Sequence, residues 1–423
     1  MKLFYCAFES IFNPVFDSQV LTYIKKINNR LAKENLLVIL VVFSSIADLF
    51  KKNYLYKKKK IKKLLKGNCI FSFKLPYFYR FPFIFRFSLF LNSIICLFVF
   101  LFIFRLKKTA RAIIHCRTEV ASFILLRIKK LFYRNIKIIC DCRGIGSKEI
   151  LYKYGKKKGL FISKKIEEVE RFAQRNSDYV FCVSNSFKDF ILKRNKSEIK
   201  KIKVIPCCID INKFKYDPHL RKQVRGEMNI GDKFVVLYSG SLNEWQLPLE
   251  MIKIFSIFKK IIKNSIFILF TKDIEYTKIL FLNSGLDKGS YIIDYKPYNV
   301  INKYLLLGDL GLLIREKNDV NRVAFPVKFS EYVRCGVPVL SSITSDVINM
   351  IGKFKLGYKL NNYSDPYEIK KIALNIKSNI TYLKSNEYKS RISNVIRVNV
   401  GWEKYIDSAV DVYKDILFNK GLN

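Results

Sequence analysis

Short apolar runs alternate with amphipathic stretches along the whole chain. In the first half these runs are rich in Val, Ile and Phe, as buried parallel strands are; they cover residues 37–45, 111–116, 137–140 and 179–184. Residues 17–35 and 163–178 carry apolar positions three to four apart after an initial Asp or Ser, which is typical of capped helices. The order predicts repeated βαβ units.

A second series of apolar runs fills the other half of the chain. It comprises residues 234–240, 265–271, 290–294, 310–315 and 337–342, separated by helical patterns. Between the two series, Pro and Gly residues near 206–231 break the periodicity. Because 423 residues exceed what one hydrophobic core usually supports, we expect an α/β protein with two facing Rossmann-like domains, each built on a parallel sheet, and an interdomain cleft.

Two segments depart from this rhythm. Residues 51–67 contain nine lysines, and residues 87–104 form an apolar run between Arg86 and Arg105. As a helix the run would be about 27 Å long, which is short for a bilayer crossing. A crossing here would also divide the strands of one sheet, so we expect a helix that packs on the N-terminal sheet and leaves one apolar side for lipid, beside lysines attracted to anionic headgroups. A spanning helix, or an internal helix beside a solvated basic loop, is the alternative.

Composition limits the class of protein. The 36 Phe and 25 Tyr residues exclude a disordered chain. A net charge of +42 favours an acidic partner, either nucleic acid, an anionic membrane or a phosphorylated small molecule, although a compositionally biased genome would produce part of it. The ten cysteines lack CxxC spacing and only two histidines are present, so we expect reduced core thiols and no zinc site. The start of the chain does not resemble a signal peptide, which favours a cytoplasmic protein.

Residues 326–342 carry the clearest chemical signal. Lys328 and Glu331 are three apart at the expected start of a helix, and Gly336 and Pro338 then turn the chain into a buried strand. The positive end of a helix favours an anion, and Lys328 adds a full charge. An ionised Glu331 can accept two hydrogen bonds from a ribose diol. The pair therefore suits the two halves of a nucleoside diphosphate; the alternative is a surface ion pair.

A small-residue turn follows the first strand of the second series. Ser239, Gly240 and Ser241 would let backbone N–H groups approach phosphate oxygens, although such a turn can also be a plain loop. Ligands of open α/β sheets bind beyond the carboxyl ends of the strands. We therefore expect this turn and Lys328 at one edge of one sheet.

The motifs resemble, in order, the group 1 retaining glycosyltransferases with the GT-B fold. The matching segments are residues 181–191, 204–214, 238–245, 302–315, 326–342 and 399–417. Residues 12–24, 115–119 and 140–149 resemble a branch of bacterial polysaccharide enzymes. The resemblance implies an acceptor-binding domain over residues 1–208, completed by a C-terminal helix over 399–423, and a nucleotide-sugar-binding domain over 209–398.

The resemblance also implies roles for individual residues. Lys328 would bind the diphosphate and Glu331 the ribose, with Gly240 and Ser241 in the phosphate-facing turn. Lys328 would stabilise the leaving group, helped by Arg315 or Lys272. The residues expected on the acceptor side are His115, Arg117, Arg143, Glu149 and Ser184.

Two departures from the family pattern bear on activity. Val323 stands where the family has an earlier Glu, and Ser241 and Gln246 stand where many members have Arg and Lys. The chain contains no D-x-D triplet, so we expect a metal-independent enzyme without a cofactor. The departing phosphate would then take the acceptor proton itself.

The resemblance finally implies partners and a location. We expect a nucleotide-sugar donor and an oligosaccharide or lipid-linked acceptor in capsule, lipopolysaccharide or other polysaccharide synthesis, peripheral on the inner face of the cell membrane and without nucleic acid. The rival interpretations are a basic protein that binds nucleic acid or a membrane surface, and an inactive or epimerase-like GT-B relative.

Overall fold

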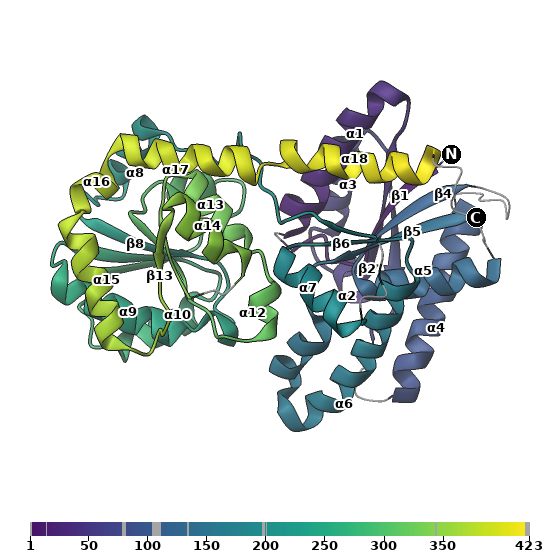
Figure 1. Cartoon of the computed structure of the whole chain (residues 1–423), viewed down its shortest axis with the longest axis horizontal. Coiled ribbons are helices and arrows are strands. Elements are labelled where there is room, and N and C mark those ends of the chain that lie inside the picture. Colours follow the sequence, from purple (N-terminus) through teal and green to yellow (C-terminus); the bar gives the residue numbers. More distant parts are fainter. Residues whose placement is uncertain are drawn as a thin grey trace. The chain divides into compact units, whose positions relative to one another are not determined.

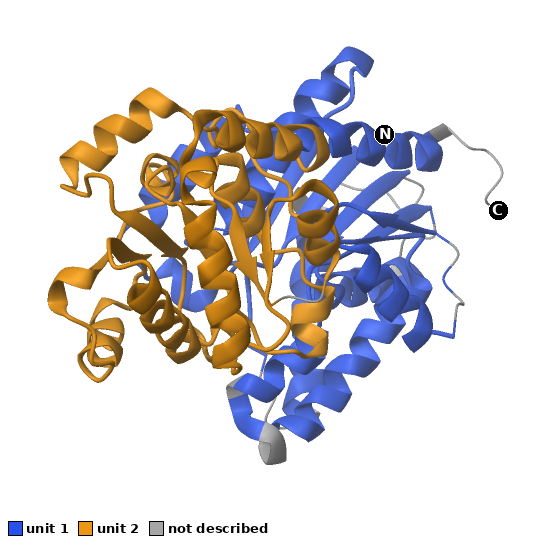
Figure 2. Ribbon diagram, turned by 60° about the vertical axis from the view of Figure 1, so that its left-hand side comes forward, with its two compact units in different colours: residues 1–206, 402–423 blue, residues 207–401 orange. Residues whose placement is uncertain are grey.

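The computed structural model describes residues 2–13, 15–77, 82–103, 111–132, 135–196, 199, 201–342 and 345–418. The chain forms two compact units, shown in blue and orange in Figure 2. Unit 1 contains residues 1–206 and 402–423, and unit 2 contains residues 207–401. The chain passes between the units at 206/207 and 401/402, where the sequence prediction placed the boundaries at 208/209 and 398/399.

Unit 1 is built on a parallel sheet of seven strands in the order β3-β2-β1-β4-β5-β6-β7. The strands are β1 (Lys2–Ala7), β2 (Val38–Ser45), β3 (Cys69–Lys74), β4 (Ala112–Arg117), β5 (Ile136–Cys142), β6 (Tyr179–Cys182) and β7 (Ile202–Val204). The four predicted strands are confirmed as β2, β4, β5 and β6. Strand β1, near the start of the chain, was not predicted. The edge strands β3 and β7 were not predicted either, because their side chains are mostly half-buried and form no clear apolar run.

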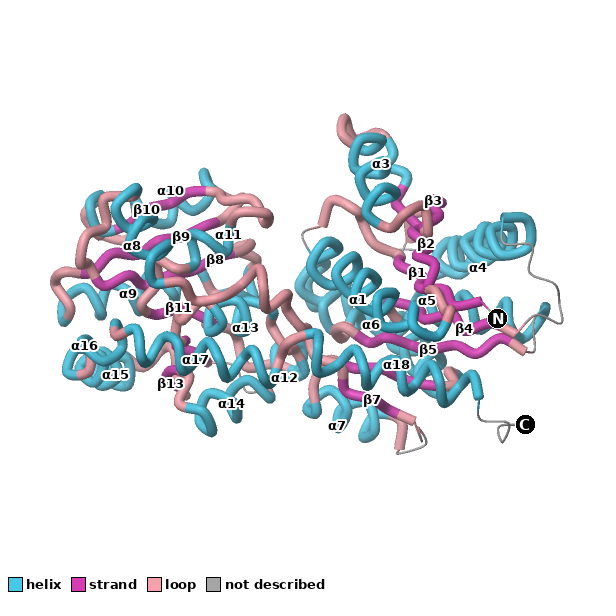
Figure 3. Tube along the Cα trace, turned by 90° about the horizontal axis from the view of Figure 1, so that it is seen from above, coloured by secondary structure: helices cyan, strands magenta, loops and turns pink. Residues whose placement is uncertain are grey.

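Helices cover both faces of this sheet, as Figure 3 shows. They are η1 (Phe16–Leu21), α1 (Thr22–Leu31), η2 (Ala32–Glu34), α2 (Ile46–Leu49), α3 (Tyr54–Leu64), α4 (Pro82–Phe98), η3 (Val99–Ile103), α5 (Glu119–Phe132), α6 (Gly146–Asn176), α7 (Asn185–Arg194) and α18 (Trp402–Phe418). The predicted helices at 17–35 and 163–178 correspond to η1 with α1 and to the second half of α6. The apolar run predicted at 87–104 lies in α4 and η3, but residues 104 and 105 fall outside the described part of the chain.

The C-terminal helix α18 belongs to unit 1 although it follows unit 2 in sequence (Figure 1). It packs on α1, where the hydroxyls of Tyr23 and Tyr413 are 3.0 Å apart and the Lys26 ammonium is 2.6 Å from the Glu403 carboxylate. Trp402 at its start is fully buried. Unit 1 is therefore closed by residues from both ends of the chain.

Unit 2 is built on a parallel sheet of six strands in the order β10-β9-β8-β11-β12-β13. The strands are β8 (Phe234–Ser239), β9 (Ser265–Phe270), β10 (Tyr291–Asp294), β11 (Leu310–Leu313), β12 (Val339–Ser341) and β13 (Gly357–Lys359). The five predicted strands are confirmed as β8 to β12. Strand β13 was not predicted, because its three residues begin with Gly357 and end with a charged side chain.

The helices of unit 2 follow the same βα alternation. They are α8 (Pro218–Glu227), η4 (Glu244–Gln246), α9 (Pro248–Ile261), α10 (Ile274–Leu282), η5 (Lys288–Ser290), α11 (Ile301–Leu305), α12 (Asp319–Val323), α13 (Val327–Arg334), α14 (Asp346–Phe354), α15 (Pro366–Ser378), α16 (Ile380–Lys384) and α17 (Asn386–Asn399). Local sequence sets their starts; for example, Asp217 caps α8 by accepting a hydrogen bond from the Leu220 N–H, and Pro218 occupies the first turn. The predicted α/β class with two parallel sheets is confirmed.

A buried charge cluster ties the amino ends of β8 and β11 to two helices. The carboxylate of Asp309 is 2.7 Å from Arg221, 3.4 Å from Arg225 and 3.5 Å from Lys389, and it accepts a hydrogen bond from the Val235 N–H at 3.0 Å. Burial raises the pKa of Asp309, but the three cations outweigh this effect and lower the pKa to about 2. The ionised carboxylate thus holds α8 and α17 on the sheet of unit 2.

The substitution Asp309→Asn should lower the free energy of unfolding by about 3–5 kcal/mol, because it leaves three buried cations without their counter-ion. Because folding lowers the pKa of Asp309, its contribution is present above pH ~4 and is lost as the pH falls towards 2. Urea unfolding followed by circular dichroism measures both effects. Asp319→Asn, which breaks an exposed ion pair with Arg322, is the control and should cost less than about 1 kcal/mol. Equal losses for the two variants would contradict the assigned role of the cluster.

Candidate functional site

The carboxyl edge of the unit 2 sheet brings together residues from separate motifs. Gly240 directly follows β8, Arg315 lies two residues beyond β11, and Lys328 lies in the first turn of α13. β8 and β11 are adjacent strands, so the loops that follow them share one part of this edge. This is the edge at which open α/β sheets bind ligands.

The Lys328 side chain lies directly against the turn after β8. A Cβ atom at Gly240 would be 2.4 Å from both Cε and Nζ of Lys328, and Gly240 has φ +141°. The Lys328 ammonium donates a hydrogen bond to the Tyr238 hydroxyl at 2.7 Å and lies 4.3 Å from the centre of that ring. Only a glycine at position 240 therefore leaves space for this lysine.

The two cations at this edge have no paired anion. Among the described residues, no carboxylate lies within 4.0 Å of the charged nitrogens of Lys328 or Arg315. The Nη1 of Arg315 donates to Asn321 at 3.4 Å, whereas its buried Nε has no hydrogen-bond partner within the described part of the chain. Burial lowers the pKa of Lys328 well below its ordinary value, and the charge of Arg315 lowers it further. Such a site favours the arrival of a negative charge.

Glu331 lies one turn after Lys328 on α13. No ion pair joins the two side chains in the described structure, so the alternative of a simple Lys–Glu surface pair is wrong. Burial raises the pKa of Glu331 to about 7, against the opposing charges of Lys213 and Lys328. Its half-buried carboxylate accepts no hydrogen bond from the described residues, which leaves both oxygens available to a ligand.

Hydrogen bonds fix the turn that faces Lys328. The Tyr238 hydroxyl donates to the Ser241 carbonyl at 2.6 Å, and the Ser239 N–H donates to the Tyr332 hydroxyl at 2.7 Å. The Leu242 N–H donates to the Asp273 carboxylate at 3.0 Å. Tyr238 and Tyr332 were not predicted; the available signal for Tyr238 was a phenol hydroxyl near the end of β8, after Val235, Val236 and Leu237.

Lys272 does not join this group. It follows β9 and is exposed, and its ammonium lies 5.5 Å from the centre of the Tyr295 ring, which follows β10. The strand order places β10 on the side of β9 away from β8. The structure therefore directs Lys272 away from Lys328, contrary to the prediction that it helps the leaving group.

Polar side chains also gather at the carboxyl edge of the unit 1 sheet. Arg117 ends β4 and donates to the Glu9 carboxylate at 2.6 Å, and Arg143 follows β5 and donates to Asp141 at 2.8 Å. Burial raises the pKa of Asp141, but Arg143, His115 and Arg117 outweigh it and hold the pKa well below the usual range. Within the described residues, Oε2 of Glu9, Nη1 of Arg117 and Oδ1 of Asp141 are buried without a hydrogen-bond partner. Glu9 was not predicted.

The other predicted acceptor residues have structural contacts. His115 lies inside β4 rather than at its end, because the strand continues to Arg117; it is buried, and its Nδ1 is 2.7 Å from the Tyr413 hydroxyl of α18. Ser184 is buried and caps α7 by accepting from the Phe187 N–H at 2.9 Å. Both side chains therefore make contacts inside unit 1, and their role on the acceptor side stays a prediction. Glu149 lies in the first turn of α6 against Gly144, with its pKa raised by burial and by Glu170.

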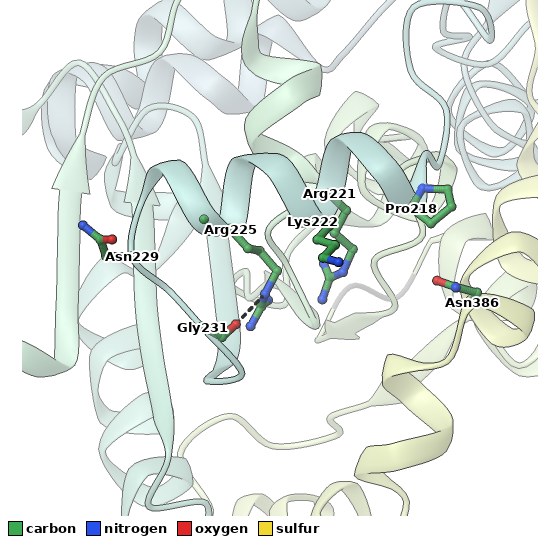
Figure 4. Close-up of a pocket in the computed structure, with 8 residues that line it drawn as sticks. Pro218, Arg221, Lys222, Arg225, Asn229, Gly231 and Asn386 are labelled. Atoms are coloured by element: carbon green, nitrogen blue, oxygen red, sulfur yellow. Dashed lines mark hydrogen bonds between the residues drawn. The ribbon is translucent and has the colours of Figure 1, made fainter.

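A pocket on unit 2 lies at the opposite edge of the sheet (Figure 4). Arg221, Arg225 and Gly231 line it, near the amino ends of β8 and β11. Both arginines are occupied: Arg225 donates to the carbonyls of Gly231 and Leu307 at 3.0 and 2.9 Å, and Arg221 donates to the Gly308 carbonyl at 3.0 Å. These guanidinium groups donate to backbone carbonyls and have few N–H groups left for a ligand. The carboxyl edge of the sheet therefore remains the candidate site.

Neither metal nor disulfide chemistry is indicated in the described residues. They contain no group of three or more His, Cys, Asp or Glu side chains that could hold a metal ion. All ten cysteines are free thiols, and all except the half-buried Cys207 are buried.

Comparison with known proteins agrees with this architecture. Residues 22–213 match Glycosyltransferase Family 4. No curated protein matches the sequence significantly. Among solved structures, sucrose-phosphate synthase from Thermosynechococcus elongatus is 12% identical, with a TM-score of 0.72 and 99% of each chain covered.

Two other solved structures are similar over their full lengths. HepE from Anabaena, in complex with UDP, is 13% identical with a TM-score of 0.69, covering 98% of this chain and 100% of that chain. TarM from S. aureus, solved with UDP and α-GlcNAc-glycerol, is 11% identical with a TM-score of 0.67, covering 99% and 100%. At these identities the likeness concerns the fold. The chain thus contains a region matching Glycosyltransferase Family 4 and has the GT-B fold.

Proposed function

We propose that the protein is a glycosyltransferase that moves a sugar from a nucleoside-diphosphate sugar to a hydroxyl group of a saccharide acceptor. The observation that carries the proposal is the pair of half-buried cations, Lys328 and Arg315, which share a sheet edge without a paired carboxylate among the described residues. A diphosphate supplies the missing negative charge. The HepE and TarM structures, which hold UDP in this fold, support the same class of ligand.

The start of α13 adds to the attraction for phosphate. No side chain of the described residues caps this helix, and although the Phe329 N–H donates to the Pro326 carbonyl at 3.1 Å, the N–H groups of Val327 and Lys328 are available to an anion. Gly240 lets the Lys328 ammonium lie directly against the turn after β8, although its own N–H donates to the Phe270 carbonyl at 2.9 Å. Together these groups can surround the phosphate oxygens without reorganisation when charge develops on them.

Glu331 is suited to bind the ribose of the donor. Its carboxylate has no hydrogen-bond partner in the described structure, and its pKa of about 7 is sensitive to ligands near neutrality. Two ribose hydroxyls would donate to the ionised form and stabilise it. Lys328 and Glu331 therefore divide the diphosphate and the nucleoside between successive turns of one helix.

The proposed reaction follows from these positions. The bond between the anomeric carbon and the β-phosphate oxygen breaks, and the acceptor oxygen bonds to the same face of that carbon, which retains the configuration. The acceptor proton passes to a departing phosphate oxygen. Lys328 and Arg315 stabilise the charge that develops on the leaving group, each with an effect of about 2.7–4 kcal/mol. No metal is required in this scheme.

We assign the acceptor to the polar edge of unit 1. Arg117 with Glu9, and Arg143 with Asp141, form two balanced ion pairs that leave buried donor and acceptor atoms unused in the described residues. A charge-balanced set of donors and acceptors suits an uncharged, hydroxyl-rich saccharide. A lipid-linked saccharide of polysaccharide, capsule or lipopolysaccharide synthesis is the acceptor we propose.

The departure at position 323 defines the alternative function. Val323 is fully buried in α12, where the family pattern has a Glu. An inactive or epimerase-like relative would keep nucleotide binding but would transfer no sugar. Radiolabel transfer to membrane-extracted acceptors separates this outcome from active transfer.

Replacing the central cation tests the proposal. Lys328→Met should lower donor turnover about 10²- to 10³-fold, because it removes one preorganised charge from the leaving group. Thermal-shift measurements with UDP-, GDP- and CMP-sugars, with and without chelator, should show protection of the wild type by a diphosphate sugar only and no effect of the chelator. Lys272→Met is the matched control and should behave as wild type. Protection by no nucleotide sugar at all would remove the support for an enzyme.

Donor binding should make Lys328 take up a proton and, by stabilising ionised Glu331, release protons from that carboxylate, so the uptake by Lys328 is the difference in proton count between the wild type and Lys328→Arg. The depressed pKa of Lys328 rises when a diphosphate arrives, so binding favours its protonated form and the affinity falls as the pH rises through the pKa of the empty site. Calorimetric titrations in two buffers with different ionisation enthalpies measure this uptake. Lys328→Arg should bind with less proton uptake, since Arg stays charged. The same number of protons exchanged on binding by the wild type and by Lys328→Arg would argue against phosphate contact with Lys328.

The space at Gly240 gives an independent test. Gly240→Ala would place Cβ 2.4 Å from the Lys328 ammonium in a backbone conformation of φ +141°, so we expect displacement of Lys328 and loss of donor binding. The strain should cost about 1–3 kcal/mol of stability. Gly289→Ala, where a Cβ meets nothing within 4 Å, is the control and should bind normally. Full donor affinity in Gly240→Ala would contradict the proposed phosphate position.

A further inference from the structure

Helix α4 has its polarity reversed relative to a helix on a water-exposed surface. Its polar residues Ser88 and Asn92 face the interior, at 3% and 1% exposure. Its large apolar residues Ile84, Phe87 and Phe90 face outward, at 40%, 50% and 50% exposure. Surface helices of globular proteins normally show the opposite pattern. The outer face of α4 is therefore built for surroundings other than water.

The outward residues form one continuous stripe. Ile84, Phe87, Phe90 and Ile94 are all at least 40% exposed; at about 100° per residue they fall within an arc of about 120°. We name these four residues the α4 stripe. An exposed cluster of this kind marks a contact surface rather than scattered surface hydrophobics.

The inner face of α4 is firmly attached to unit 1. The side chain of Asn92 accepts a hydrogen bond from the Leu75 N–H at 2.9 Å and donates to the Leu75 carbonyl at 3.3 Å, which joins the helix to the end of β3. Phe85, Leu89 and Cys96 are buried. α4 also packs on α5. These contacts fix the stripe outward.

A basic helix flanks the same edge of the sheet from its other face. β3 is the edge strand, and α3 and α4 contact it from opposite faces of the sheet (Figure 3). The side chains of Lys59, Lys60, Lys62 and Lys63 on α3 are exposed, and none forms an ion pair within the described residues. We name these four residues the α3 lysines. An apolar stripe and unpaired lysines around one sheet edge match the apolar and anionic layers of a membrane surface.

We propose that the α4 stripe and the α3 lysines dock unit 1 on an anionic lipid bilayer, with α4 lying in the plane of the membrane interface. The stripe enters the boundary between headgroups and acyl chains, and the lysines contact anionic headgroups. This surface is separate from the donor site of unit 2, so the inference does not depend on the proposed transfer reaction. It would bring a lipid-linked acceptor to the same unit that carries the polar edge.

The topology favours docking over spanning. Residues Ile84–Leu101 are long and apolar enough to cross a membrane, and 39% of that stretch is buried in the structure. However, α4 and η3 connect β3 to β4, and β4 pairs with β1 and β5 in the centre of the sheet. A helix crossing the bilayer would break the hydrogen bonds between Asn92 and Leu75 and leave the Asn92 side-chain amide unsatisfied in lipid. An in-plane helix keeps all of these contacts.

Cosedimentation of the full chain with lipid vesicles tests the proposal. Vesicles of phosphatidylcholine mixed with phosphatidylglycerol should bind the protein, and pure phosphatidylcholine vesicles should bind it much more weakly. Phe87→Ser with Phe90→Ser should lower partitioning about 10- to 100-fold, because two half-exposed rings lose their transfer to lipid. Ile279→Ser with Leu282→Ser on α10, where the side chains are 56% and 66% exposed, is the matched control and should bind as wild type.

The lysines give a second, separable test. Lys62→Glu with Lys63→Glu should lower binding to the anionic vesicles about tenfold or more at low salt, and the difference should shrink in high salt. Lys370→Glu with Lys371→Glu on α15 makes the same charge change at exposed positions of unit 2 and should have a smaller effect. Thermal protection by the donor, measured without lipid, should be unchanged in all four variants.

Four outcomes would overturn the proposal. They are failure of the wild type to bind the anionic vesicles, equal losses for the α4 and α10 variants, resistance of bound protein to extraction by alkaline carbonate, and lipid-independent dimers that Phe87→Ser with Phe90→Ser abolishes. A gel shift with nucleic acid that depends on the α3 lysines, without vesicle binding, would assign them to a different partner. Loss of donor protection with intact vesicle binding would refute the proposed function and leave the membrane surface standing.

Discussion

The placement of one ammonium group determines most of the proposed chemistry. Lys328 extends from the start of α13 across Gly240 to the hydroxyl and ring of Tyr238, where burial and Arg315 make its positive charge costly. A protein seldom keeps such a charge half-buried without a partner. The cost is offset if the partner is a ligand that arrives with its own negative charge. The proposed donor site is thus defined by an electrostatic imbalance.

Hydrogen bonds from the surrounding fold hold the turn that faces Lys328. Tyr332 holds the backbone of Ser239, and Asp273 holds the loop that follows. On the opposite edge of the same sheet, three basic side chains instead share one buried carboxylate, because Asp309 pairs with Arg221, Arg225 and Lys389. The contrast explains why the arginine-lined pocket is structural while the carboxyl edge is available. Both edges are basic, but only at the carboxyl edge do described cations, Lys328 and Arg315, lack a carboxylate within 4.0 Å.

The strand pattern was readable where strands are long and buried. Periodicity located β2, β4 and β5 because both faces of a central parallel strand are apolar. It missed the edge strands β7 and β13, which have three residues each, and β3, whose six residues are mostly half-buried. It also missed β1, although that strand is buried and central. The meeting of Gly240 with Lys328 was accessible from the rule that ligands bind beyond the carboxyl ends of strands.

Other features of the site depended on tertiary contacts that spacing does not reveal. His115 looked like the end of a strand, but β4 continues to Arg117 and Tyr413, 298 positions away, binds the imidazole. Glu9 reaches Arg117 only through the sheet register of β1 and β4. Ser184 had a local signal, since a Ser before a helix is most often its cap. The reversed polarity of α4 also appears only once its inner and outer faces are known.

The central claim is that Lys328 and Arg315 bind the diphosphate of a nucleotide ligand. Its most direct test is calorimetric titration of the wild-type protein with a nucleoside diphosphate and the matching monophosphate. The account predicts that the diphosphate binds more than about tenfold tighter, because only its second phosphate reaches both cations. Equal affinities, or binding of neither nucleotide, would contradict it.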